Sequence, residues 1–268
     1  STALNSNLCL VDLIHQALAG TQVPADVVQL IADSSREGVN EMLKLNQYLD
    51  ILIPRGGGSL IRNVLENASV PVLQTGVGNC HIYVDSSAKY PMVKDIVINA
   101  KTQRPAVCNA AETLLVAEDW AKQHLEKLCG ALLDANVQLK GCSKAKAFCP
   151  AMLDAQEEDW QNEFLDLVMA VRVVTGLDEA LEHIDKYGTK HTEAIISEDP
   201  ENTRLFLQMV DAAAVNHNAS TRFTDGFEFG FGAEIGISTQ KLHARGPVGL
   251  PELTSYKYLV HGQGQIRK

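Results

Sequence analysis

The stretch LVMAVRVVTGLDEALEHIDKYGTKHTEAIIS, residues 167–197, indicates the class of fold. Residues 167–174 are mostly apolar, and a second apolar run follows at 194–197. Between these runs, apolar residues recur at helical spacing over 177–187, and a glycine follows to end that helix. Apolar strands that do not alternate with polar residues are typical of a parallel sheet covered on both faces. The stretch therefore predicts a strand, a helix and a parallel strand, which is the repeating unit of an α/β fold.

The same alternation continues in both directions along the chain. Downstream, Asp199 caps and Pro200 opens a predicted helix that runs to Val210. Upstream, Pro91 lies in the first turn of a predicted helix that must end before Arg104, because a proline follows there. The remaining predicted helices cover 8–17, 60–65 and 120–133, and a Ser34–Glu37 capping box opens one more. The remaining predicted strands cover 27–31, 49–53, 70–73, 81–84, 113–116 and 213–217.

Composition excludes several classes of partner. The chain has 268 residues, 46% of them hydrophobic, which is enough for a full core. Its net charge of -10 works against binding to nucleic acid or to an anionic membrane, because both require a concentrated basic surface. No apolar run approaches the ~20 residues of a membrane span, and the N-terminus does not resemble a signal peptide. We expect a cytoplasmic protein.

The six cysteines are dispersed, without CxxC pairs or histidines at zinc-ligand spacing. This arrangement predicts free thiols, with neither a disulfide framework nor a metal site. Cys9 and Cys129 each lie among leucines of a helical pattern, so we expect both to pack in the interior.

Cys108 differs from the other five because of the sequence around it, NAKTQRPAVCN at 99–109. It follows Lys101, Arg104 and a helix-ending proline, and nearby positive charge favours the thiolate, which is the nucleophilic form. We interpret Cys108 as a candidate for covalent catalysis. The alternatives are a buried free thiol and a Cys/His hydrolase pair formed with one of the eight histidines.

Three further segments have both a structural and a functional interpretation. The glycines after Arg55 follow a predicted strand and open a helix, so they form either a phosphate-binding turn or a plain turn. Residues 74–80 contain a second glycine-rich run, which a hinge would also explain. Residues 218–223 form either a turn or a clamp in which an arginine and two hydroxyls hold a carboxylate. Residues 222–249 are rich in Gly and Phe, which predicts an ordered loop.

Five motifs resemble the gamma-glutamyl phosphate reductase family, also called glutamate-5-semialdehyde dehydrogenase, of the aldehyde dehydrogenase superfamily. They are LIPRGG (52–57), TGVGNCHIYVD (75–85), NAKTQRPAVCN (99–109), NASTRFTDG (218–226) and GAEIGISTQKLHARGP (232–247). The resemblance implies NADPH-dependent reduction of L-glutamyl 5-phosphate to glutamate 5-semialdehyde with release of phosphate, in proline biosynthesis. It also implies an aldehyde dehydrogenase-like α/β fold.

The resemblance implies a role for each matching residue. Cys108 would displace phosphate and form a thioester. Residues Arg55, Gly56, Gly57 and Ser59 would lie near the cofactor pyrophosphate, and Glu163 would hold the nicotinamide ribose. The substrate-binding set would be Lys101, Arg104, Asn109, Ser220, Thr221 and Arg222, and no residue would bind a metal.

Gln74 has a role that follows from the direction of the reaction. Many hydrolytic aldehyde dehydrogenases carry a glutamate at the matching position, which activates water against the thioester. An amide cannot act as a general base, so Gln74, on the cofactor side of the site, fits a reductase that must preserve this intermediate.

The resemblance also predicts a division into domains. Residues 1–78 would form the second part of a dinucleotide-binding domain, 79–245 the catalytic domain and 246–268 a C-terminal oligomerisation segment. Family members carry a preceding segment that completes the dinucleotide-binding domain, so we expect that domain to be incomplete here. Expected partners are a small-molecule substrate, further copies of the chain and glutamate 5-kinase. The alternatives are another semialdehyde dehydrogenase, or an inactive fragment that forms oligomers.

Overall fold

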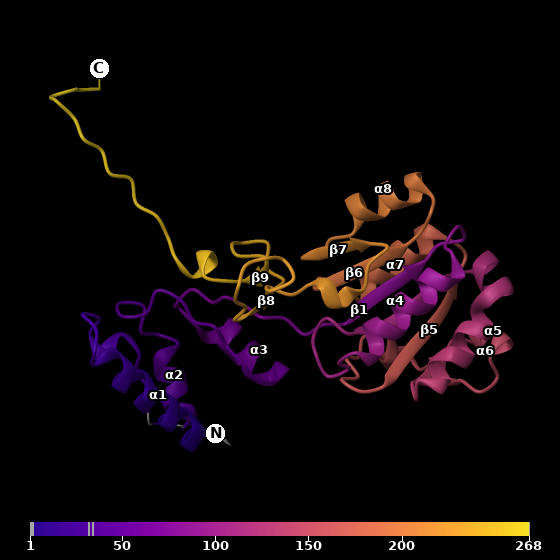
Figure 1. The fold of residues 1–268 in the computed structure, drawn as a ribbon, viewed down its shortest axis with the longest axis horizontal. Helices are drawn as coiled ribbons and strands as arrows, with labels where there is room; N and C mark the ends of the chain where they lie inside the picture. The colour runs from indigo at the N-terminus through magenta and orange to yellow at the C-terminus, as the bar shows by residue number, and fades with distance from the viewer. Residues whose placement is uncertain (1–2, 32, 34, 268) are drawn as a thin grey trace. The chain divides into compact units, whose positions relative to one another are not determined.

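The structure is a computed structural model that describes residues 3–31, 33 and 35–267. It divides into two compact units, Ser1–Val72 and Leu73–Lys268, and each is described by itself (Figure 1). The division lies six residues before the domain boundary that the resemblance implies, and the three predicted domains remain predictions.

The first unit consists mainly of helices. The predicted helix near the N-terminus is confirmed as α1, and the helix after the glycine run is confirmed as α3. The capping box at Ser34 lies outside the described residues, and the following helix begins after Ser35, whose Oγ accepts a hydrogen bond from the Gly38 amide. The bounds are α1 Leu4–Leu18, η1 Ala25–Val27, α2 Arg36–Met42 and α3 Gly58–Asn67.

The strands expected in this unit were predicted wrongly. Residues 27–31 begin within η1 and continue without regular structure, and Val27 is exposed. Among the described residues of the unit, strand-type pairing is limited to a bridge between Leu52 and Val72. An apolar run becomes a strand only where a neighbouring strand takes up its backbone hydrogen bonds, and no such neighbour borders 27–31 here. Cys9 is also exposed on α1, contrary to the packing role expected for it.

The second unit contains a seven-stranded parallel sheet, as the sequence predicted. The strand order is β4-β3-β5-β2-β1-β6-β7, so β1 and β2 lie near the centre. All residues of β1, β2 and β6 are buried, which explains why apolar residues predominate in them. The bounds are β1 Cys80–Val84, β2 Ala111–Ala117, β3 Gln138–Gly141, β4 Leu153–Asp154, β5 Val168–Val174, β6 Thr192–Ile196 and β7 Ala214–His217.

Helices cover both faces of this sheet (Figure 1). Helix α5 contacts both α4 and α6, whereas α7 contacts α8. Right-handed crossovers put these two groups on opposite faces, because the chain moves along the sheet in opposite directions before and after β4. One core runs through both layers. The bounds are α4 Tyr90–Thr102, α5 Glu118–Asp134, α6 Ser143–Phe148, α7 Leu177–Tyr187 and α8 Pro200–Met209, with η2 Glu157–Trp160 between β4 and β5.

Several local predictions are confirmed. Helix α4 carries Pro91 in its first turn and ends at Thr102, before Arg104. Helix α7 covers the predicted range and is followed by Gly188. Asp199 caps α8 by accepting hydrogen bonds from two backbone amides of its first turn. The short elements β3, α6 and β4 were not predicted.

Residues after β7 are mostly irregular, as predicted for the Gly- and Phe-rich segment. They include η3 Thr221–Phe223 and a two-stranded antiparallel ribbon of β8 Gly236–Ser238 and β9 Gly246–Val248, with η4 Pro251–Leu253 after it. Residues 256–260, within the predicted C-terminal oligomerisation segment, have no regular structure, and their side chains are exposed. Among the described residues, no helix is long and apolar enough to span a membrane.

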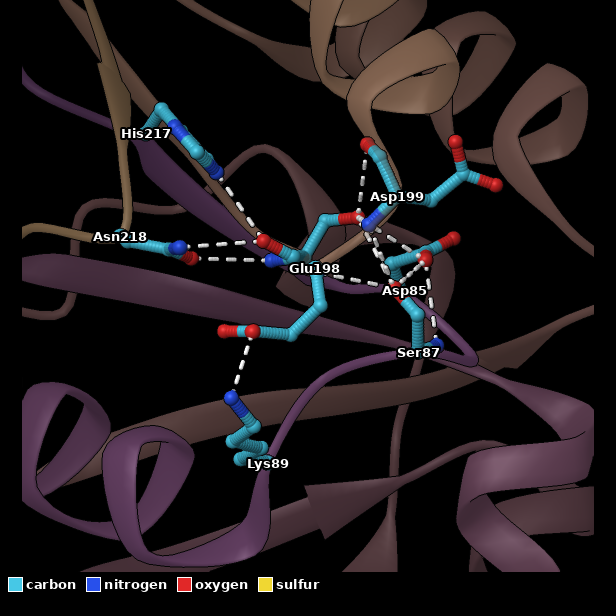
Figure 2. A network of polar contacts seen from close by, with 8 residues as sticks. Asp85, Ser87, Lys89, Glu198, Asp199, His217 and Asn218 are labelled. Carbon is cyan, nitrogen blue, oxygen red and sulfur yellow. Dashed lines mark hydrogen bonds and ion pairs between the residues drawn. The ribbon is translucent and has the colours of Figure 1, made fainter.

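A parallel sheet has two distinct edges, which we name for the strand ends that they expose. The amino edge carries the residues that precede the strands, and the carboxyl edge carries those that follow them. At the carboxyl edge, buried Asp85 follows β1 and accepts hydrogen bonds from the Ser87 amide and hydroxyl, the Ser197 hydroxyl and the Asn202 side chain (Figure 2). Asn218 binds both backbone groups of Ser197, so the ends of β1, β6 and β7 are joined.

Candidate active site

Cys108 lies at the amino edge, in the turn between α4 and β2, as the sequence predicted. The turn is closed by a hydrogen bond from the Ala110 amide to the Val107 carbonyl, with N and O 3.0 Å apart. The Cys108 residue is partly exposed, whereas both residues after it are buried. The nucleophile candidate thus stands at the rim of the core, on a short turn between two regular elements.

Gly78 connects Cys108 to Glu163. A Cβ atom at position 78 would lie 1.4 Å from the Cys108 carbonyl oxygen, so that oxygen occupies the space of a side chain. The Gly78 amide donates to Glu163 Oε1 across 2.9 Å. Sequence reasoning offered a hinge as one interpretation of this glycine-rich run, and at Gly78 the structure shows a close backbone approach instead. It brings together two residues that the sequence analysis had proposed separately.

Arg222 lies close to the same turn. Its Nε donates to Gln103 Oε1 across 2.6 Å, which ties η3 to the end of α4. Partial burial lowers the pKa of Arg222, and among the charges that act on it are those of Cys108 and Arg104. Ser220 caps η3, with its Oγ accepting from the Arg222 amide. The predicted arginine and hydroxyl residues are therefore on one short element beside the nucleophile turn.

Asn109, Thr221 and Thr224 form a buried polar group next to Cys108. Asn109 Nδ2 donates to the Thr224 carbonyl across 2.9 Å, and the Thr224 amide donates to the Thr221 carbonyl. Asn109 Oδ1 and the two threonine hydroxyls have no hydrogen-bond partner among the described residues. Buried polar atoms are nearly always paired, so three unpaired ones together indicate a place for water or for a polar ligand. Thr224 was not among the residues proposed from sequence.

Lys101 does not lie with the other proposed substrate residues. Its side chain is 0% exposed, and its Nζ is 2.6 Å from Oε2 of Glu112, which is equally buried. Burial raises the pKa of Glu112 to about 7 and lowers that of Lys101, and the attraction between the two groups opposes both changes. In this structure, Lys101 is one half of an internal ion pair and is not available to a substrate, so its proposed substrate contact is not supported.

Gln74 and Asn79 belong to the segment that leads into β1. The backbone amide of Gln74 donates to Gln240 Oε1 across 2.9 Å, and this hydrogen bond holds the segment against the loop after β8. Asn79 Nδ2 donates to the carbonyls of Trp160 and Tyr187. The backbone on both sides of Gly78 is therefore fixed by side-chain contacts.

The proposed cofactor loop lies in the first unit. Arg55 is exposed, and Gly57 precedes α3, a ten-residue helix whose first amides are not used within it. Such a helix end favours a phosphate group. A cavity of about 520 Å³ lies between α2 and α3 and includes Ser59 and Leu60 in its wall. These features of the first unit suit the phosphate and nucleoside parts of a dinucleotide.

The fold has close counterparts among solved structures. An acetylating aldehyde dehydrogenase from Geobacillus thermoglucosidasius superimposes with a TM-score of 0.70 at 19% identity, over 95% of this chain and 65% of that one. This likeness establishes the fold alone. The fold of the chain is therefore aldehyde dehydrogenase-like.

Sequence comparison is more specific. The chain is 61% identical over its whole length to gamma-glutamyl phosphate reductase of Halalkalibacterium halodurans and 56% identical to that of Thermoanaerobacter pseudethanolicus. The crystal structure of gamma-glutamyl phosphate reductase from Thermotoga maritima matches with a TM-score of 0.96 at 53% identity, over 99% of this chain and 64% of that one. No protein-family model matches. The chain is similar over its whole length to these gamma-glutamyl phosphate reductases and spans 65% of the length of the curated relatives.

Proposed function

We propose that this chain provides the catalytic cysteine for reduction of L-glutamyl 5-phosphate to L-glutamate 5-semialdehyde and phosphate. The observation that supports the proposal is that Gly78 packs against the Cys108 oxygen and binds Glu163, while Arg222 binds Gln103 at the end of α4, in a chain 56–61% identical to gamma-glutamyl phosphate reductases. The name of those relatives supplies the substrate, and the turn before β2 supplies a suitable nucleophile.

The covalent step follows from the chemistry of a thiolate and an acyl phosphate. The Cys108 sulfur attacks the acyl carbon, the bond from carbon to the phosphate oxygen breaks, and phosphate leaves with the bonding electrons. A thioester on Cys108 remains. Addition of a hydride gives a hemithioacetal, which collapses to the aldehyde and returns the thiolate.

NADPH is the proposed cofactor, and it would supply that hydride. Within the first unit, the amino end of α3 and the cavity beside Ser59 would bind its phosphate and nucleoside parts, with Arg55 adding positive charge. Glu163, held by the Gly78 amide, would accept hydrogen bonds from the nicotinamide ribose.

The substrate carboxylate would be held by the polar group next to the nucleophile turn. Arg222 has donors beyond the Nε that binds Gln103, and a guanidinium pairs well with a carboxylate. The unpaired Thr221 hydroxyl and Asn109 Oδ1 provide a hydrogen-bond donor and an acceptor beside it. Ser220 and exposed Arg104 complete the proposed set. Gln74 would leave the thioester without a general base for hydrolysis.

Oligomerisation, coupling to glutamate 5-kinase and a cytoplasmic location are also proposals. The exposed residues around Tyr256 and Leu259 support the first, because they offer apolar side chains on an extended segment with unused backbone groups. The dispersed cysteines, without paired spacing, favour a reducing compartment.

The test is the reverse reaction, in which glutamate 5-semialdehyde reduces NADP+ in the presence of phosphate. Cys108→Ala is expected to abolish turnover, because no other group in this turn can form the thioester. The matched control is Cys9→Ala, which removes an exposed thiol from α1 and should leave the rate unchanged. Oxidation of the aldehyde without phosphate would favour the alternative semialdehyde dehydrogenase. Undiminished phosphate-dependent turnover in Cys108→Ala would contradict the proposed nucleophile.

A further inference from the structure

Cys80 is a buried thiol that the proposed mechanism does not use. It is the first residue of β1, and its side chain is 0% exposed. Its Sγ lies 3.2 Å from the Cys108 carbonyl oxygen, in the geometry of a hydrogen bond donated by the thiol. The contact joins residues 28 positions apart in the chain, so the sequence contains no local signal for it.

A second contact fixes the thiol from the other side. The Cys80 sulfur also lies 3.9 Å from Nδ1 of His191, the residue just before β6. The sulfur therefore lies between the start of β6 and the nucleophile turn. A thiol can accept one hydrogen bond while it donates another, so the two contacts are compatible.

We propose that Cys80 is a positioning residue, which fixes the nucleophile turn through the Cys108 carbonyl. The proposal rests on the function proposed above and adds a second cysteine to the same site. In a planar trans peptide the carbonyl and the following amide hydrogen point in opposite directions. When Cys80 and Gly78 hold the Cys108 oxygen, they also set the direction of the Asn109 amide and the start of β2.

The protonation state of Cys80 is compatible with this role. Burial, followed by the charges of Glu193 and Cys108, raises the pKa of the Cys80 thiol well above its ordinary value. The thiol therefore keeps its proton at neutral pH and remains a donor. The two cysteines have different tasks, because Cys108 reacts as a thiolate whereas Cys80 acts through its S–H group.

A matched pair of variants isolates the donor. Cys80→Ser and Cys80→Ala both shorten the side chain, but only serine keeps a hydrogen to donate. Cys129→Ala is the control, because it removes another fully buried thiol, in α5 and away from the turn. In each variant of this chain, hydrogen exchange is measured at the Ala110 amide, which closes the turn, and kcat and KM are measured in the phosphate-dependent assay.

Cys80→Ala is expected to speed exchange at Ala110 by roughly 3–10-fold, which is the size of one lost hydrogen bond. It should lower kcat by a similar factor with KM unchanged, and Cys80→Ser should restore both values. An unchanged exchange rate at Ala110 in Cys80→Ala would overturn the proposal, whether or not the chain is catalytically active. Faster exchange with an unaltered kcat would also overturn it. Faster exchange that serine reverses, in a chain that shows no turnover in any form, would support the anchor and count against the proposed function.

Discussion

The two edges of the seven-stranded sheet treat buried polar groups differently. At the carboxyl edge, both oxygens of Asp85 accept hydrogen bonds, with Ser87 among the donors (Figure 2) and Ser197 and Asn202 as further donors. The chain after β7 reaches the nucleophile turn at the amino edge, where Thr224 binds Asn109. There Thr221 is as deeply buried as Asp85, yet its hydroxyl has no partner among the described residues.

The difference indicates which edge is built for binding. Many α/β proteins bind ligands beyond the carboxyl ends of their strands. In this chain the carboxyl-edge polar groups around Asp85 are used to join loops, whereas the amino edge combines a nucleophile with unsatisfied donors and acceptors. A saturated polar cluster stabilises the fold, and an unsaturated one next to Cys108 leaves hydrogen bonds for a substrate to make.

Gly78→Ala should give the largest effect on activity. It tests the amino edge without changing the rest of the sheet. The new Cβ would lie 1.4 Å from the Cys108 oxygen, so the turn must move. We expect kcat to fall by at least about 100-fold, because a displacement of this kind near reacting groups has that cost. Gly130→Ala on α5 meets no atom within 4 Å and should leave kcat unchanged. Equal kcat values for the two variants would show that Gly78 is not required.

Asp85→Asn tests the carboxyl edge. An amide replaces one acceptor oxygen with a donor, so either the Ser87 backbone amide or the Asn202 side-chain amide loses its acceptor. We expect a loss of about 2–3 kcal/mol in the free energy of unfolding, measured with urea, and an unchanged KM. Asp95→Asn, on the exposed side of α4, is the control and should change little. A raised KM without loss of stability would reverse the roles assigned to the two edges.

Thr221→Val compares the edges directly, because valine matches threonine in shape and lacks the hydroxyl. Thr221 has no partner to lose, so stability should stay within about 1 kcal/mol of the original, while KM for the glutamyl substrate rises roughly 5–10-fold. Thr203→Val should do the opposite, because the Thr203 hydroxyl donates to the Asp199 carbonyl near the carboxyl edge. If both variants lose only stability, Thr221 does not bind substrate.

His183→Phe should have the smallest effect on activity and stability at neutral pH. It tests a buried group without hydrogen-bond partners, away from the nucleophile. Both ring nitrogens of His183 lack partners among the described residues, and burial lowers its pKa to about 2. The unfolded chain therefore takes up a proton below about pH 6.5 that the folded chain does not, so this residue reduces stability as the pH falls.

Phenylalanine does not titrate, so it removes this loss of stability at low pH. Relative to the original chain, His183→Phe should gain about 2 kcal/mol more at pH 5 than at pH 7.5, measured by urea unfolding at both values. Activity at pH 7.5 should not change. The same stability difference at the two pH values would show that the ring is already protonated in the folded chain.

The sequence predicted the second unit well because its signals are local. The caps of α8, the proline in α4 and the apolar strands each act within a few residues. Gly78 and Cys80 escaped detection because their effect is a contact with a turn about 30 residues further on.

Lys101 shows a signal that was present and misinterpreted. It lies eight residues after Val93 and four after Val97, on the buried stripe of α4, so helical spacing alone puts it in the core. Proximity in sequence to Cys108 was the wrong guide. In the first unit the strands failed for another reason, because apolar runs do not specify whether a neighbouring strand is present.

The position of β1 has a consequence for the order of folding. This strand pairs with β6, which the ribosome delivers more than a hundred residues later. Contacts of such long range close slowly, and until they form, an apolar strand in the middle of the sheet remains exposed on one side. The thiol of Cys80 meets His191, the residue just before β6, when that pairing forms. Cys108 is therefore synthesised early. The turn that carries it acquires its final geometry only after β6 has been synthesised and has paired with β1.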